Sequence, residues 1–154
     1  MQRQIISFSC EHFDDSRPNA VSITPLIGGV LLTQLISDFE KSKEYEPAGR
    51  YAGIVPAFFR YGPLDEYFLG ESGPDSYWRK IGGVYVLSCP CGEAGCWPLQ
   101  CRIRVEGDDV IWGDFRQPHR PARDYSGFGP FFFDGAQYRD ALEHALGKIR
   151  GPGE

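Results

Sequence analysis

Residues 98–115, PLQCRIRVEGDDVIWGDF, contain two short runs of strand-forming residues joined by a polar turn. From Leu99 to Glu106 apolar and polar side chains alternate, which is typical of a β-strand with one covered face. GDD supplies the turn, and VIWGDF supplies the returning strand. The stretch therefore predicts an antiparallel hairpin in which Cys101 points toward the core and Gln100 points away from it.

The segment GVYVLSC at 83–89 precedes this hairpin and predicts a third antiparallel strand, which gives a β-meander over 83–115. Apolar residues recur at helical spacing in two other places and predict helices at 30–43 and 135–149. In the first of these helices, Glu40 falls outside the apolar stripe. We expect an α+β fold, with a largely antiparallel sheet whose central β-meander is packed by two main helices.

Three shorter segments have the composition of strands: QIISFSC at 4–10, VSITPL at 21–26 and FFFD at 131–134. Asp134 is the expected N-cap of the second helix, and Gln137 three positions later completes a capping-box pattern. We expect that helix to cover the sheet.

Residues 44–80 contain many prolines and glycines, which interrupt any regular periodicity. The segment is nonetheless rich in aromatic residues, namely Phe58, Phe59, Tyr61, Tyr67, Phe68, Tyr77 and Trp78. These rings either wrap the core through short turns or form a contact face. We favour the first alternative because aromatic side chains are more often buried than displayed.

The chain has 154 residues, 42% of them apolar, and we expect a single globular domain over 1–154 with a frayed end at 151–154. No apolar run approaches the roughly 18 residues that cross a bilayer, and the first residues lack the pattern of a secretory signal. We therefore expect a cytoplasmic protein with no membrane partner. The formal net charge of −5 disfavours nucleic acid as a partner, because binding to phosphate backbones depends on Lys and Arg.

Four of the five cysteines lie between residues 89 and 101, a segment that we call the cysteine knuckle. Cys89, Cys91 and Cys96 form a C-x-C-x4-C pattern on the turn between two predicted strands. Structural zinc takes four thiolate or imidazole ligands in a tetrahedron. The pattern predicts a zinc ion bound by these three thiolates. Unliganded thiols, or a redox pair of Cys91 and Cys96, are the alternatives.

Four residues are candidates for the fourth zinc ligand: His119, Cys101, Cys10 and His12. His119 is the first choice because it follows the strand that should pair with the strand leaving the knuckle. Its alternative role is that of a solvated loop histidine beside Arg120 and Arg123. Cys101 is more simply explained as a small buried side chain.

Arg116, Arg120 and Arg123 form a local basic cluster in an acidic chain. Because guanidinium groups form paired hydrogen bonds with oxyanions, these arginines are the predicted binding residues for a phosphate or a carboxylate. The favoured alternative is that they form ion pairs on a solvated loop, with partners such as Asp114 and Asp124.

The motifs of several enzyme classes are missing from the sequence. The H-x-E motif of nucleobase deaminases does not occur, and four residues rather than two separate Cys91 from Cys96. There is no dinucleotide fingerprint and no phosphate loop. A zinc ion held by three thiolates is a poor Lewis acid, so structural zinc is favoured over hydrolytic zinc.

Three segments carry a resemblance to a known family: CPCGEAGCWPL at 89–99, WGDFRQPHR at 112–120 and DYSGFGPFFFDGAQYRDAL at 124–142. In these segments the chain resembles a family of short bacterial proteins that share C-x-C-G-E-x-G-C-W-P-L, D-F-x-Q-P-H-R and D-Y-x-x-F-G-P-F-x-F-D motifs and have no established activity. The resemblance implies that the knuckle and the Gln-Pro-His-Arg segment occur together, which fits a zinc site shared by the three cysteines and His119. It implies no substrate.

These observations favour a small cytoplasmic bacterial binding module of the immunity or antitoxin kind, whose acidic surface meets a basic protein partner, over an enzyme. A binding protein needs only a stable scaffold and an aromatic or charged face. The alternative is a small hydrolase or oxidoreductase that uses a cysteine thiolate or an open zinc site.

Overall fold

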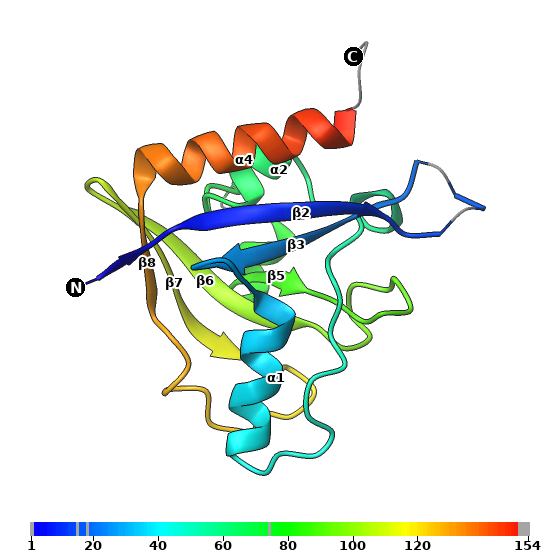
Figure 1. Cartoon of the computed structure of the whole chain (residues 1–154), viewed down its shortest axis with the longest axis vertical. Helices are drawn as coiled ribbons and strands as arrows, with labels where there is room; N and C mark the ends of the chain where they lie inside the picture. Colours follow the sequence, from blue (N-terminus) through cyan, green and yellow to red (C-terminus); the bar gives the residue numbers. More distant parts are fainter. Residues whose placement is uncertain (1, 15, 18, 74, 151–154) are drawn as a thin grey trace.

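The computed structural model describes residues 2–14, 16–17, 19–73 and 75–150 (Figure 1). The predicted frayed end at 151–154 lies outside these residues. The fold is α+β, as expected, and its described strands form two sheets.

The larger sheet has five strands and contains the predicted meander. Its order is β1 (Arg3–Gln4), β8 (Phe131–Asp134), β7 (Asp109–Arg116), β6 (Leu99–Glu106) and β5 (Val84–Leu87). Neighbouring strands are antiparallel except for β1, which runs parallel to β8. The antiparallel meander predicted over 83–115 is therefore confirmed.

The second sheet has three antiparallel strands, which are β2 (Ile6–His12), β3 (Val21–Ile27) and β4 (Val30–Leu31). The sequence pattern predicted one sheet, whereas the chain crosses from the first sheet to the second between Gln4 and Ile6. Periodicity shows which residues are extended, but the choice of pairing partner depends on contacts distant in sequence. The division into two sheets is for this reason a feature that the pattern did not reveal.

Both predicted helices are confirmed as α1 (Leu32–Ser42) and α4 (Gly135–Arg150). The segment 44–80 contributes three shorter elements, namely η1 (Pro56–Phe58), α2 (Leu64–Tyr67) and α3 (Tyr77–Ile81). Within the described residues, none of the helices combines the length and the apolar character needed to cross a membrane.

Asp134 caps α4, as predicted, because its Oδ2 accepts a hydrogen bond of 3.1 Å from the backbone N–H of Gln137. The Gln137 side chain does not complete the capping box. It bonds instead to the backbone N–H and C=O of Ile6, at 3.1 and 2.7 Å. These bonds attach α4 to β2, along which the helix runs in Figure 1.

Most aromatic side chains of the segment 44–80 are buried, so the core-wrapping alternative holds for Tyr61, Tyr67, Phe68 and Trp78. Phe59 and Tyr77 behave differently, with exposed fractions of 38% and 51%. Their ring centroids lie 6.3 Å apart, and we call this exposed pair the aromatic shelf. The segment thus supplies both core and surface.

The central strand β6 departs from its predicted alternation at Gln100 and at Val105, which was expected on the covered face but is 38% exposed. Cys101 is buried, as predicted, but Gln100 is buried as well, with only 2% of its surface exposed. The Gln100 amide donates hydrogen bonds to the backbone oxygens of Ile81 and Gly83. A buried amide is tolerated when its hydrogen bonds are satisfied, which explains why polarity alone gave the wrong prediction here.

Candidate metal centre and adjacent groove

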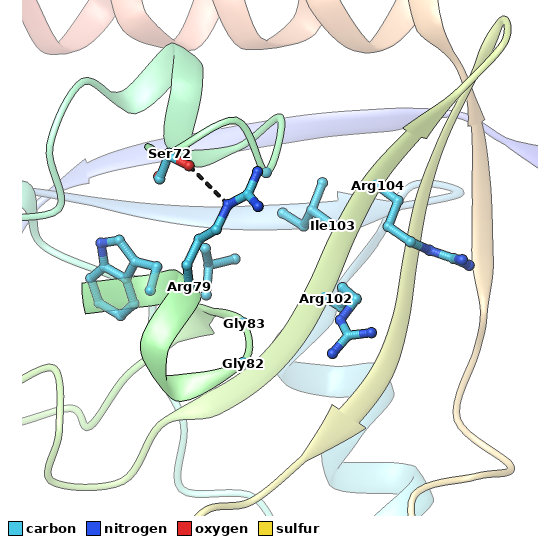
Figure 2. A pocket seen from close by; sticks show the side chains of 10 residues that line it. Ser72, Arg79, Gly82, Gly83, Arg102, Ile103 and Arg104 are labelled. Carbon is cyan, nitrogen blue, oxygen red and sulfur yellow. Dashed lines mark hydrogen bonds between the residues drawn. The ribbon is translucent and has the colours of Figure 1, made fainter. Parts of the chain in front are cut away.

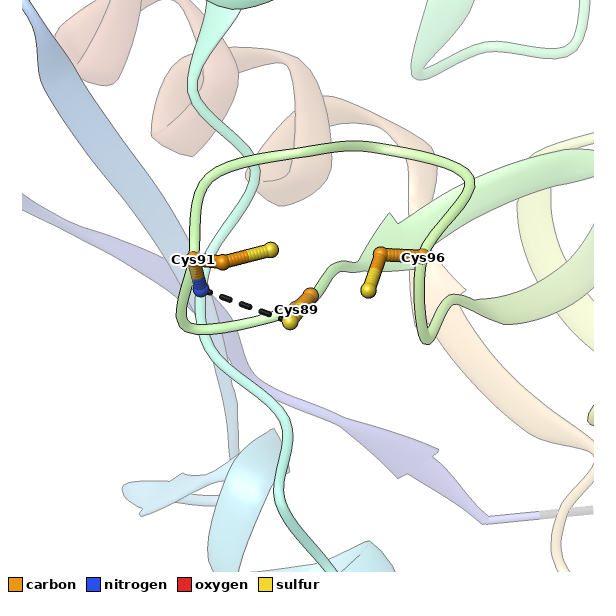
Figure 3. A group of neighbouring side chains, drawn as sticks. All are labelled: Cys89, Cys91 and Cys96. Carbon is orange, nitrogen blue, oxygen red and sulfur yellow. Dashed lines mark hydrogen bonds between the residues drawn. The ribbon is translucent and has the colours of Figure 1, made fainter.

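The loop between β5 and β6 brings together the three cysteines of the C-x-C-x4-C pattern (Figure 3). The sulfur atoms of Cys89, Cys91 and Cys96 all lie within 4.8 Å of one another. In a tetrahedral zinc site, metal–sulfur bonds of about 2.3 Å place the sulfurs about 3.8 Å apart. A small contraction of the loop would therefore bring the three thiolates to metal-binding distance, so the group could hold a metal ion.

Aromatic contacts hold both ends of this loop. Gly92 adopts a φ of +94°, and a Cβ there would lie 2.8 Å from the Phe58 ring and 3.1 Å from the Phe13 ring. Only glycine therefore fits against this ring pair. At the other end, the Trp97 indole donates a hydrogen bond of 2.9 Å to the Gly49 carbonyl. The knuckle is thus packed onto the protein through side chains other than its sulfurs.

The thiols of Cys89 and Cys91 have unequal proton affinities. Burial, followed by a hydrogen bond with Cys91, raises the pKa of Cys89 above its ordinary value. Hydrogen bonds to the Cys91 sulfur from Cys89 and from the Glu93 backbone lower the pKa of Cys91. Of these two thiols the exposed Cys91 therefore ionises first, and Cys89 stabilises the resulting thiolate.

His119 contacts the knuckle, because its Nε2 lies 2.6 Å from the backbone oxygen of Gly95. It is not one of the three residues whose ligand atoms are grouped, and its side chain is exposed. The other candidates for the fourth ligand also lie outside that group. Cys101 is buried in the core, the Cys10 sulfur faces the Ala145 carbonyl at 3.8 Å, and His12 ends β2.

Arg116, Arg120 and Arg123 line a single groove of about 490 Å³. The other lining residues are Ile81, Tyr85, Gln100, Gln117, Pro118 and Pro121. The groove adjoins the knuckle through Trp97, the residue after Cys96. The Arg120 and Arg123 guanidinium carbons lie 5.0 and 5.8 Å from the centre of a Trp97 ring. We call this hollow the arginine groove.

Arg116 and Arg120 are held by neutral acceptors. The Nε of Arg116 donates to the Gln100 side-chain oxygen at 2.7 Å, and its Nη2 donates to the Ile81 carbonyl. Arg120 donates from Nη1 to the His119 carbonyl at 2.9 Å. Among the described residues, no carboxylate lies within 4.0 Å of either guanidinium.

Arg123 has a different environment, because it forms a buried ion pair with Glu40 at 3.3 Å. The Glu40 carboxylate also accepts hydrogen bonds from the Gly49 N–H and from the hydroxyls of Tyr51 and Tyr125. Each oxygen of the carboxylate therefore has a donor. We call these five residues the Glu40 cluster.

The prediction that Asp114 and Asp124 form ion pairs with these arginines is wrong. Asp114 lies 3.8 Å from Arg102, and Asp124 accepts a hydrogen bond from the Ser126 N–H. The partner of Arg123 is Glu40, which the sequence analysis placed outside the apolar stripe of α1. A usable signal was nevertheless present, because the buried residues Leu32, Ile36 and Glu40 recur every four positions along the helix.

A second hollow, of about 350 Å³, lies where β5 begins beside β6 (Figure 2). Three arginines line it, but Figure 2 shows Arg79 turned toward Ser72 while Arg102 and Arg104 extend away from it. Arg102 and Arg104 also have acidic neighbours, at 3.8 and 3.5 Å. These guanidinium groups do not converge on one ligand, so the arginine groove is the stronger candidate.

A scan against protein-family models and searches of the curated proteins and of the solved structures give no match to this chain. Function is therefore inferred from the residues of the knuckle and the groove.

Proposed function

We propose that this chain is a small protein-binding module in which a structural zinc ion stabilises the face that contacts the partner. The observation that carries this proposal is the contact between the knuckle and two arginines of the groove. Trp97 follows Cys96 directly, and its ring packs against the guanidinium groups of Arg120 and Arg123. Fixing the sulfurs would therefore help to fix the ring on which these two arginines lie.

Zinc is the metal we propose, with Cys89, Cys91, Cys96 and His119 as ligands. Thiolate and imidazole are the usual donors of closed structural zinc sites. The His119 ring already lies against the loop, at Gly95, and would have to exchange that contact for the metal. With four protein ligands no position remains for a reacting water, which supports a structural role.

The partner we propose is a protein, and an immunity or antitoxin role in the bacterial cytoplasm is the biological setting. Arginine and aromatic residues are enriched in protein interfaces, and this surface offers two arginines without acidic partners among the described residues. The net charge of −5 supports a protein partner over a nucleic acid. The family resemblance of the knuckle and the Gln-Pro-His-Arg segment supports the bacterial setting.

One observation favours an enzyme as the second candidate. Cys91 is exposed, and hydrogen bonds lower the pKa of its thiol, which are the properties of a nucleophilic cysteine. If His119 does not bind the metal, a three-thiolate ion would also retain an open position for a substrate. Turnover of a substrate that disappears in Cys91→Ala, while the fold survives, would favour the enzyme.

Two measurements test the binding module. Elemental analysis of protein purified without added metal should give about one zinc per chain, retained in Cys101→Ser and lost in Cys91→Ser. A partner identified by co-purification should form a stoichiometric complex with the purified chain, and the Arg116→Ala/Arg120→Ala variant should weaken it. Arg123 is left intact in that variant because it belongs to the Glu40 cluster. Metal-free protein together with an unchanged complex would overturn the proposal.

A further inference from the structure

The arginine groove carries positive charge that its own surroundings leave uncompensated. Within the part of the chain that the structure describes, its lining contains three arginines and no acidic residue. Glu40 neutralises Arg123, whereas the contacts of Arg116 and Arg120 described above are with neutral oxygens. The groove therefore has two available positive charges in a chain whose formal net charge is −5. A local excess of this kind selects an anionic group.

The hydrogen bonds of the two arginines leave specific donors free for a ligand. Arg116 already donates hydrogen bonds from Nε and from Nη2, which form one side of its guanidinium group. The two N–H groups of Nη1 and the second N–H of Nη2 remain available to a ligand. Arg120 uses Nη1, which leaves its Nε and Nη2 edge. Each remaining pair of N–H groups matches the two oxygens of a carboxylate. The existing bonds also hold the guanidinium planes, which lowers the entropy lost on binding.

The groove continues toward the aromatic shelf along α3. Ile81 lines the groove, and Tyr77 lies four residues earlier on the same face of that helix. Burial, followed by the neighbouring Tyr77 side chain, raises the pKa of Tyr85 to about 12. Tyr85 also lines the groove, so the shelf residue Tyr77 lies near a groove residue.

Resting on the proposed function, we propose that the partner inserts an extended acidic segment into the arginine groove. Its carboxylates bind Arg116 and Arg120, and an adjacent aromatic or large apolar side chain packs on Phe59 and Tyr77. A continuous polyanion such as a nucleic acid carries phosphates well beyond the two arginines, where the acidic remainder of the chain would repel them, whereas the charges of a short acidic segment end at the groove. An acidic protein segment uses both parts of the surface.

The test is an NMR titration of the zinc-loaded protein with an acetylated peptide amide of four glutamates followed by one phenylalanine. The matched control peptide has glutamine in place of each glutamate, and inorganic phosphate is the second control. We expect the acidic peptide to shift the side-chain N–H signals of Arg116 and Arg120 and the ring signals of Tyr77. Neither control should reproduce the full pattern.

Single variants test separately the contributions of the two arginines and of the aromatic shelf to peptide binding. Arg116→Ala and Arg120→Ala should each weaken the acidic peptide about tenfold, because one charge-assisted contact is lost. Tyr77→Ala should weaken it about threefold and remove the advantage of the terminal phenylalanine. Arg104→Ala, in the second hollow, is the matched control and should leave the affinity unchanged.

Three outcomes would overturn the acidic-segment proposal: no shifts at Arg116 and Arg120 up to about 10 mM peptide, equal binding of the glutamine peptide, or tighter binding of phosphate. A stoichiometric protein partner that binds the Arg116→Ala/Arg120→Ala variant normally would overturn it too, while leaving a binding function in place. Metal-free protein without any partner would instead overturn the proposed function, while shifts at Arg116 and Arg120 in that metal-free protein would still support the acidic segment.

Discussion

The loop from Arg116 to Arg123 places chemically identical side chains in two different environments. Arg123 has only 7% of its side chain exposed and pairs with a fully buried carboxylate. Arg120 is exposed at the surface, on Trp97 and the His119 carbonyl. The first arginine holds the scaffold together, and the second presents its charge to the outside. Closeness in sequence therefore groups these arginines without assigning them a common role.

The difference follows from the cost of desolvating a charge. A carboxylate inside the protein loses its hydration and is tolerated only if donors surround it. Glu40 lies on α1, and its donors come from Gly49 and Tyr51 in the loop that follows the helix and from Arg123 and Tyr125. An exposed guanidinium keeps much of its hydration and needs no acidic partner. Removing an arginine should therefore destabilise the protein strongly at position 123 and only slightly at position 120.

Arg123→Ala tests this comparison with the largest expected effect. Removing the guanidinium leaves the Glu40 charge buried without its ion-pair partner, so the free energy of unfolding should fall by about 3 to 5 kcal/mol. Arg120→Ala should change it by no more than about 0.5 kcal/mol. Urea denaturation of both variants, followed by circular dichroism, measures the two values.

A double variant provides the control for Arg123→Ala. Glu40→Leu combined with Arg123→Ala removes the buried charge as well, and it should recover part of the stability lost in the single variant. Equal and small losses for Arg120→Ala and Arg123→Ala would show that the Glu40 cluster is not a structural unit.

The cysteines allow a second comparison of the same kind, between the knuckle and the core. Cys91→Ser should lose the bound zinc, and with it about 2.7 kcal/mol of stability at a free zinc concentration one hundred times the dissociation constant. Cys101→Ser should retain the zinc and lose about 1 to 3 kcal/mol, because its hydroxyl would be buried in the core. Thermal unfolding with and without added zinc separates the two cases. Loss of zinc in Cys101→Ser, together with retention of zinc in His119→Ala, would show that Cys101 and not His119 is the fourth ligand.

Periodicity and spacing account for what could be predicted from this sequence. The meander, α1, α4 and the burial of Cys101 all follow from local patterns that a short segment carries by itself. The convergence of Cys89, Cys91 and Cys96 follows from their closeness on one turn. Each of these features can be predicted without knowing which distant residues it contacts.

The features that could not be predicted depend on partners far away in the chain. Glu40 is buried because Arg123 and Tyr125 reach it from more than eighty positions later. Gln100 is buried because carbonyls near the end of α3 accept its amide protons. The separation of β2 from the larger sheet likewise depends on its pairing with β3. Composition alone carries no record of such contacts.

The contact of Trp97 with Arg120 and Arg123 predicts that the metal and the groove influence each other. Removing zinc with a chelator should loosen the residues around Cys96 and weaken the binding of the acidic peptide about fivefold. Isothermal titration calorimetry of the zinc-loaded and zinc-free forms measures the change. By thermodynamic reciprocity, saturating peptide should strengthen zinc binding by the same factor. If the peptide affinity is the same with and without zinc, the knuckle and the groove are not coupled.

The smallest expected effect concerns the metal-free knuckle, where Cys91 should react with iodoacetamide faster than Cys89. The pKa of Cys91 is lowered and that of Cys89 is raised, so near pH 7 the reactive thiolate is concentrated on Cys91. The rate advantage should shrink as the pH rises through the ordinary thiol range, because both sulfurs are then ionised to a larger extent. Cys89→Ala removes the thiol that donates to Cys91 and should slow the Cys91 reaction near pH 7 more than near pH 9. Mass spectrometry of timed, quenched samples resolves the two sites. If Cys91 and Cys89 react at equal rates across this pH range, the knuckle sulfurs do not share a proton, and Cys91 loses its support as a nucleophile.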